Sequence, residues 1–110
     1  MPKKPLQPKI ETRRLSDLTP DPENANEGSD RGRQLLDESL SQFGFLTPGV
    51  LDASDTTIIG NKRKEAAEKA GMSDALIIES DGTRPIYIRR TDLDLYSADP
   101  DVVARTRAAA

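Results

Sequence analysis

Residues 56–71, TTIIGNKRKEAAEKAG, decide how the rest of this chain folds. The β-branched residues at positions 56–59 favour a short buried strand. Gly60 permits a backbone conformation that a side chain would forbid. Asn61 is a favourable N-cap, residues 62–70 are mostly good helix formers, and Gly71 is placed to end the helix. The stretch therefore predicts a strand, a tight turn and a helix.

Cations stand at the start of this predicted helix, where the helix dipole disfavours them. Lys64 can pair with Glu68, four residues later. Lys62 can pair with Glu65 at a spacing of three. Arg63 has only alanines at these spacings. A cation without a helical partner, beside the free amides of a helix start, indicates an external anion such as phosphate, and a solvated surface arginine is the alternative reading.

The composition limits the chemistry that is available. The chain has 110 residues, a length that suits one small domain. The composition predicts a small aliphatic core, because 35% of the residues are hydrophobic and only 4% are aromatic. A net charge of -3 argues against a protein that coats DNA non-specifically. Cysteine and histidine are both absent, which excludes disulfides, thiol chemistry, the usual zinc sites and histidine bases. We expect a cytoplasmic protein, since no apolar run reaches membrane-spanning length.

The domain organisation follows from composition along the chain. Residues 1–9 are rich in lysine and proline and are expected to be a disordered leader. Residues 10–96 are expected to form the domain. Residues 97–110 predict a C-terminal helix that begins at Asp99 and Pro100 and ends in alanines with little to anchor them. Both a truncated helix and one that docks on another subunit fit this ending.

A first helix is expected over residues 31–43, with Ser29 or Asp30 as its N-cap and Gly44 past its end. Its apolar stripe consists of Leu35, Leu36, Leu40 and Phe43. Ser39 falls inside this stripe, and its default role is a hydrogen bond to the carbonyl four residues earlier. A functional Ser39 would instead brace a neighbouring loop.

The expected fold class is α+β, a small mixed sheet with two or three packed helices. The predicted strands are residues 10–15, 50–51, 56–59, 75–79 and 86–90. The helices over 31–43 and 61–70 are expected to turn Leu36, Leu40, Phe43, Ala66 and Ala70 inward. Residues 19–30 contain many turn formers and predict a long loop, which is often functional. Within it, Asn24 and Asn26 either close Asx turns or point their amides at a ligand.

The order of these motifs resembles the ParB N-terminal domain of the ParB/sulfiredoxin superfamily. The resemblance rests on Leu36-x-x-Ser39-Leu40-x-x-x-Gly44-x-x-x-Pro48, followed by a hairpin, Gly60-Asn61-Lys62-Arg63 and an alanine-rich helix. It covers residues 11–95. The ending Arg89-Arg90-Thr91-Asp92-Leu93-Asp94-Leu95 is similar to stand-alone ParB-like domains of bacterial phage and mobile DNA, which are often described as ParB domain nucleases.

The resemblance implies a phosphate site at the turn. In chromosome-partitioning ParB, the motif Gly-Glu-Arg-Arg cradles the phosphates of CTP, and here Gly60, Asn61, Lys62 and Arg63 stand in its place. Asn61 replaces the acidic residue, and a neutral amide is no general base. The family's earlier box, Asn-Pro-x-Gln-x-Arg, falls on residues 21–26, DPENAN, where the arginine is missing. Sulfiredoxin chemistry is excluded, because its catalytic cysteine would fall at Asn61.

Two classes of function remain open on these residues. The first, which we place ahead, is a binding module that holds a phosphate of a CTP-like nucleotide or of nucleic acid, in DNA partitioning or processing. The second is a metal-dependent DNA nuclease, with catalytic residues unassigned. Such a nuclease needs clustered carboxylates, and the candidate groups are Asp92 with Asp94, Asp52 with Asp55, and Glu79 with Asp81. A protein-interaction domain that has no ligand is a third reading.

The predicted phosphate or nucleotide site comprises Gly60, Asn61, Lys62, Arg63, Asn24, Asn26 and Ser39. No residue is assigned to a metal held by the protein alone. Mg²⁺ accompanying a nucleotide is the candidate cofactor. Nucleotide or DNA is the expected partner, a second copy of the chain is a further candidate, and no membrane partner is expected.

Overall fold

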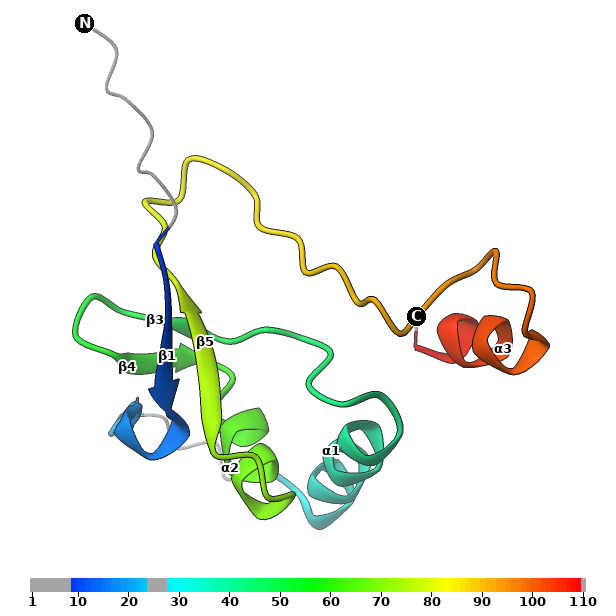
Figure 1. Cartoon of the computed structure of the whole chain (residues 1–110). Coiled ribbons are helices and arrows are strands. Elements are labelled where there is room, and N and C mark those ends of the chain that lie inside the picture. The colour runs from blue at the N-terminus through cyan, green and yellow to red at the C-terminus, as the bar shows by residue number, and fades with distance from the viewer. Residues whose placement is uncertain (1–8, 24–27, 110) are drawn as a thin grey trace, which may run out of the picture. The chain divides into compact units, whose positions relative to one another are not determined.

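The fold was obtained as a computed structural model that describes residues 9–23 and 28–109. The predicted leader at residues 1–8 and the candidate ligands Asn24 and Asn26 lie outside the described residues. The described residues divide into two units, residues 9–79 and residues 80–109. The strands β1 to β5 and the helices α1 and α2 belong to the first unit, and α3 belongs to the second (Figure 1).

Strands β1 (Ile10–Arg14) and β5 (Asp74–Ile78) form an antiparallel two-stranded sheet. Side chains alternate along both strands between a half-buried and an exposed face. Ala75 and Ile77 of β5 face the core, as the period of two requires. A 3-10 turn over Leu15–Asp17 follows β1 and buries Leu15.

A second sheet has the strand order β2-β4-β3. Strand β2 (Thr19–Pro20) runs parallel to β4 (Thr56–Ile59), and β3 (Val50–Leu51) runs antiparallel to it. In Figure 1, β3 and β4 run across the direction of β1 and β5. The strands thus build two small sheets where one mixed sheet was expected, because β1 pairs only with β5 among the described strands.

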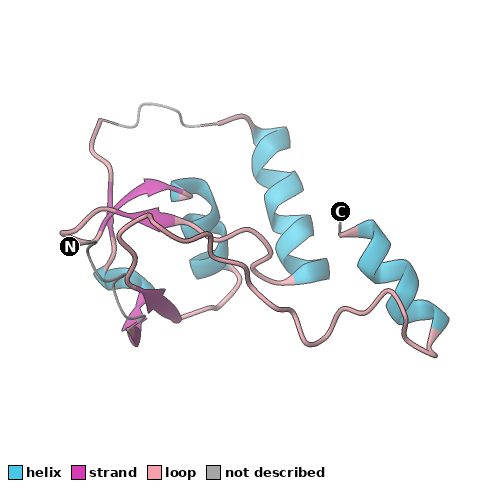
Figure 2. Cartoon of the chain, turned by 90° about the horizontal axis from the view of Figure 1, so that it is seen from above, coloured by secondary structure: helices cyan, strands magenta, loops and turns pink. Residues whose placement is uncertain are grey.

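The helix boundaries agree closely with the capping signals of the sequence. Helix α1 (Asp30–Phe43) begins after Ser29, whose hydroxyl accepts a hydrogen bond from the Gly32 N–H at 3.0 Å. Gly44 ends it with φ 69°. Helix α2 (Asn61–Lys69) ends in a left-handed Gly71, with the N–H of Met72 bonded to the carbonyl of Ala67. The two helices lie side by side (Figure 2).

The hydrophobic core is small. Its central cluster is Leu15, Leu18 and Ala67, with Leu51, Met72, Ala75 and Ile77 packed against it. Leu40 of α1 and Ala66 of α2 are also buried, as expected. The expectation that Ala70 faces inward is wrong, because Ala67 takes that place and Ala70 ends the helix on the exposed side. Leu35 of the predicted stripe is also exposed.

The predicted strand at residues 86–90 is absent from the described structure. These residues have no regular secondary structure and no strand partner among the described residues, and Tyr87 is 90% exposed. Alternation and β-branched residues favour an extended backbone, but a strand also needs a neighbour to pair with. Helix α3 (Pro100–Ala108) starts as predicted, with the Asp99 side chain accepting from the Asp101 N–H at 2.9 Å.

Candidate functional site

The turn between β4 and α2 is built on Gly60. Its backbone is left-handed, with φ 100° and ψ 21°, which confirms the need for glycine at this position. An ideal Cβ on Gly60 would lie 3.1 Å from the Cα of Gly49, so the chain before β3 packs directly on the turn. Gly49 is equally confined, since its own ideal Cβ would lie 2.8 Å from the Ile59 carbonyl oxygen.

Asn61 is the first residue of α2, and the expectation that it caps the helix is wrong. Gly60 is the N-cap and supplies no side chain. The Asn61 Nδ2 instead donates a hydrogen bond to the Thr57 carbonyl oxygen at 3.0 Å. This bond connects the first residue of α2 to strand β4 across the turn. The Asn61 Oδ1 is buried and makes no hydrogen bond with the described residues. The Asn61 side chain therefore stabilises the turn through this hydrogen bond, with its amide oxygen buried.

The cations of the first turn of α2 differ in their partners. Lys64 pairs with Glu68 at 2.6 Å, as the i,i+4 spacing predicts. The predicted pair of Lys62 with Glu65 is absent from the ion pairs among the described residues. Arg63 likewise has no ion pair or hydrogen bond there. No acidic residue lies in the first turn of α2. The helix start thus combines free amides with two cations that no described carboxylate neutralises.

The ends of the loop over residues 21–28 flank this turn. Strand β2 runs parallel to β4, and parallel strands end at the same edge of their sheet. The loop therefore leaves Pro20 at the edge where β4 passes into Gly60. At its other end, an ideal Cβ on Gly28 would lie 3.6 Å from the Lys62 Cε. Both described ends of the loop therefore lie beside the turn.

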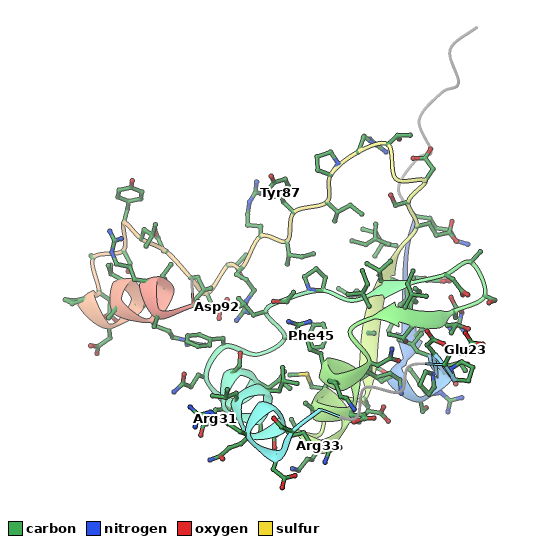
Figure 3. All side chains as sticks on the ribbon, turned by 180° about the vertical axis from the view of Figure 1, so that it is seen from behind. Glu23, Arg31, Arg33, Phe45, Tyr87 and Asp92 are labelled. Carbon is green, nitrogen blue, oxygen red and sulfur yellow. The ribbon has the colours of Figure 1, made fainter. Side chains whose placement is uncertain are left out.

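A pocket of about 80 Å³ lies between α1 and α2. It is lined by Arg33, Leu36, Asp37, Lys62, Glu65, Ala66 and Lys69. Arg33, labelled in Figure 3, contributes from α1, and two other lining residues, Lys69 and Asp37, form an ion pair at 3.0 Å. Lys62 therefore borders both this pocket and the turn.

Ser39 is half-buried on α1 and is not among the residues that line this pocket. Its default hydrogen bond to the carbonyl four residues earlier is absent from the described structure, as is any other hydrogen bond of its hydroxyl.

The candidate metal ligands in the hairpin turn have structural partners. Asp52 Oδ1 accepts from the N–H of Thr56 and from the N–H and hydroxyl of Ser54, each at 2.9 Å. These bonds, with the Thr56 N–H foremost, lower the pKa of Asp52 below its ordinary value. Asp55 pairs with Arg13 of β1 at 3.0 Å. The Asp52 carboxylate therefore stabilises the hairpin turn, and the Asp55 carboxylate connects that turn to β1.

The carboxylates of the second unit are also engaged. Arg90 donates two hydrogen bonds to Asp92 (labelled in Figure 3), from Nε to Oδ1 and from Nη2 to Oδ2, both at 2.8 Å. This pairing lowers the pKa of Asp92 and raises the pKa of Arg90. Arg105 of α3 lies 3.5 Å from the same carboxylate. Asp94 accepts from the Tyr96 N–H at 2.8 Å.

The last candidate group is divided between a strand end and a turn. Glu79 lies 4.0 Å from Lys9, and Asp81 accepts from the N–H of Thr83 at 3.0 Å. Across residues 9–23 and 28–109, no group of three acidic side chains is placed to hold a metal ion. The structure therefore brings Gly60, Asn61, Lys62 and Arg63 together but does not gather the proposed nuclease carboxylates.

Two residues of the site region were missed by the sequence analysis. Gly49 supports the turn, and its place next to Pro48 at a strand start is a signal for close backbone approach. Thr57 is 4% exposed, and its hydroxyl has no hydrogen-bond partner among the described residues. No feature of a β-branched strand residue signals this in advance.

Comparison with known proteins supports the resemblance. No protein-family model matches the chain. A solved structure of a Pnob8-like ParB-N domain shares the fold, with a TM-score of 0.54 and 23% identity. The similarity covers 66% of this chain but only 29% of that one.

None of the helices in the described ranges has the length and apolarity that crossing a bilayer requires.

A sequence relationship identifies the family. The ParB-like nuclease domain-containing protein YnaK of Escherichia coli (strain K12) is 35% identical over 74 residues. These residues make up 67% of this chain and 85% of that protein. On this identity and coverage, the chain belongs to the family of ParB-like nuclease domain proteins.

Proposed function

We propose that this ParB-like domain binds a phosphate group of a nucleotide or nucleic acid at the turn formed by Gly60, Asn61, Lys62 and Arg63. The phosphate oxygens would accept hydrogen bonds from the backbone amides that begin α2. The Arg63 guanidinium would supply a charge-assisted contact, and Lys62 a second positive charge. We assign this chemistry to DNA partitioning or processing, an assignment that the family relationship supports.

One observation carries the proposal. Arg63 and Lys62 lie in the first turn of α2, and neither pairs with a carboxylate among the described residues. Two cations beside the positive end of a helix repel the helix dipole and one another. A bound anion removes this repulsion, whereas Lys64 already has Glu68 at 2.6 Å and needs none.

The surroundings of the turn support the proposal. The described ends of the loop over residues 21–28 flank the turn and would border a bound group. The first turn of α2 has no carboxylate of its own. Mg²⁺, where required, would therefore arrive coordinated by the nucleotide phosphates, as it usually does.

The E. coli relative is a ParB-like nuclease domain-containing protein, which supports a second candidate, cleavage of a nucleic acid backbone. Phosphate binding is a requirement of both candidates, because a nuclease must also hold the phosphodiester that it cleaves. A metal-dependent nuclease needs clustered carboxylates in addition. Because the described carboxylates form no such cluster, we place binding ahead of cleavage.

Isothermal titration calorimetry with CTP, ATP, inorganic phosphate and a short DNA oligonucleotide, each with and without Mg²⁺, tests the proposal. We expect Arg63→Ala to weaken binding about ten- to hundredfold, since a hydrogen bond to a charged group contributes about 1.5–3 kcal/mol. Arg89→Ala removes an arginine from the other unit and is the matched control. Circular dichroism checks that both variants keep the fold.

Two outcomes would contradict the proposal. Unchanged affinity of Arg63→Ala would show that the turn does not contact the ligand. If none of these ligands bound or raised the melting temperature, the third reading, a protein-interaction domain, would take its place. Incubation of the same oligonucleotide with Mg²⁺ or Mn²⁺, followed by electrophoresis, reports on cleavage.

A further inference from the structure

The outer face of the β1–β5 sheet is apolar and uncovered by the unit to which it belongs. Three cross-strand pairs make up this face, Ile10 with Ile78, Thr12 with Leu76, and Arg14 with Asp74. Ile10 is 64% exposed and Leu76 is 74% exposed. We call these six residues the outer face.

We infer that the outer face is the contact surface of a homodimer, in which it packs against the outer face of a second copy of the chain. The argument rests on its self-complementarity. A twofold axis that runs parallel to the strands lays β1 of one copy over β5 of its partner. Because the register pairs Ile10 with Ile78 within a chain, the same axis places Ile10 over the partner's Ile78.

The charged end of the face fits the same arrangement. The axis that brings the isoleucines together also places Arg14 over the partner's Asp74, and it does so twice, once in each direction. The Arg14 side chain is 75% exposed, and its one ion pair with a described residue is the 3.5 Å contact of its Nε with Asp17 Oδ2. Asp74 has no ion pair with any residue in the described ranges. Opposite charges therefore meet at one end, isoleucines meet at the other end, and Thr12 lies over the partner's Leu76 between them.

The small core explains why a second copy would stabilise the sheet. The buried apolar residues of the described chain are only Leu15, Leu18, Leu40, Ala66 and Ala67. An isolated two-stranded sheet is marginally stable in water, and a covered apolar face is what stabilises it. Packing of one sheet on another at about 10 Å is the ordinary way to bury such a face.

The size of the face sets the strength of the contact. Two short strands supply much less area than the roughly 800 Å² per partner of a standard stable interface. The dimer is therefore weak and concentration-dependent, with fast exchange between copies. This expectation separates it from an obligate dimer, which would stay associated on dilution.

Sedimentation velocity of the full chain, run from micromolar to millimolar concentration, tests the contact. We expect the weight-average mass to rise from one copy toward two, and Leu76→Asp to remain a monomer over the whole range. Tyr87→Asp, which changes another highly exposed side chain outside the outer face, is the control and should associate like the unchanged chain.

A charge exchange identifies the two residues that meet. R14D and D74R should each weaken association at least about tenfold, because each puts like charges across the axis. An equimolar mixture of R14D and D74R should recover association as a heterodimer, in which both crossing pairs are again of opposite sign. Weakening of the strand pairing within one chain cannot be rescued by mixing, so recovery reports contact between copies.

A mass of one copy at every concentration would overturn the inference, and would leave the face to another segment of the same chain. Association that survives Leu76→Asp, or a mixture of R14D and D74R that stays monomeric, would show that copies meet elsewhere. Neither result bears on phosphate binding, which Arg63→Ala tests separately.

Discussion

Gly49 and Gly60 lie backbone against backbone, so that an ideal Cβ on Gly60 would meet the Cα of Gly49 at 3.1 Å. This contact fastens the segment before β3 to the turn that begins α2. Gly60 needs its glycine for two reasons, the left-handed backbone and the lack of space. Gly49 needs it for space alone, since its ideal Cβ would lie 2.8 Å from a backbone oxygen.

A glycine-to-alanine series separates the two effects. Gly82 has φ 81° and open space around it. Gly82→Ala should therefore lower the free energy of unfolding only by the strain of a left-handed residue, about 1–2 kcal/mol. Gly49→Ala should cost about 1–3 kcal/mol through overpacking. Gly60→Ala combines both and should be the least stable. Each kcal/mol lowers the melting temperature by about 4–8 °C in a domain of this size, which calorimetry measures. Equal melting temperatures for Gly49→Ala and the unchanged chain would contradict the close contact.

The hydrogen bond from Asn61 to the Thr57 carbonyl leads to a prediction about how stability depends on pH. Asn61→Asp replaces a donor to the Thr57 carbonyl with a carboxylate oxygen, which should cost about 1–3 kcal/mol at neutral pH. The positive end of α2 and the neighbouring Lys62 and Arg63 favour the charged form of the introduced acid. Burial and the Thr57 carbonyl oxygen, which the side chain faces directly, outweigh them and raise its folded-state pKa above the unfolded value of about 3.9. Its protonated form can donate to Thr57, so the loss relative to the unchanged chain should shrink as pH falls through the folded pKa.

Urea unfolding of Asn61→Asp from acidic to neutral pH measures this dependence. Asn61→Ala is the control, because it also loses the hydrogen bond but introduces no titrating group. A constant difference between Asn61→Asp and Asn61→Ala across this pH range would show that the side chain does not face the Thr57 carbonyl.

The lysines of α2 should differ in their effect on ligand affinity. Lys62→Gln removes a cation with no described ion pair, and should weaken phosphate binding and reduce its dependence on salt. Lys64→Gln removes a lysine that already pairs with Glu68 at 2.6 Å, and should leave affinity almost unchanged. Calorimetric titrations at low and high salt compare the two variants. Equal losses for both would indicate a general charge effect in place of a defined site.

The carboxylate of Asp92 should titrate below its ordinary range because Arg90 holds its charged form. An acid with a depressed folded pKa stabilises the fold above its unfolded pKa, and this stabilisation is lost as pH falls through the folded pKa. Arg90→Gln should therefore move the titration midpoint of Asp92 upward. Side-chain carboxyl NMR measures this midpoint, and Arg89→Gln, one residue away, should leave it in place.

Much of the candidate site can be predicted from sequence, because its geometry depends on neighbouring residues. The left-handed Gly60, the pairing of Lys64 with Glu68 and the lack of a helical partner for Arg63 all follow from spacing within one turn. The direction of Asn61 could not be predicted in this way. An asparagine at a helix start can cap the helix or turn back, and here the Thr57 carbonyl across the turn takes its amide.

The sequence by itself determined the elements whose ends depend on local hydrogen bonds, such as α1 after Ser29 and α3 after Asp99. Only the tertiary structure decided how the strands pair and which face of α2 is buried. Residues 86–90 have the pattern of a strand but no partner in the described structure, and Ala67 is buried where Ala70 was expected. The physical reason is the sequence separation of the interacting groups. The hydrogen bonds of helix caps and tight turns form between residues only a few positions apart. Strand pairing and burial depend on segments far apart in the chain, and a local pattern does not specify which segments meet.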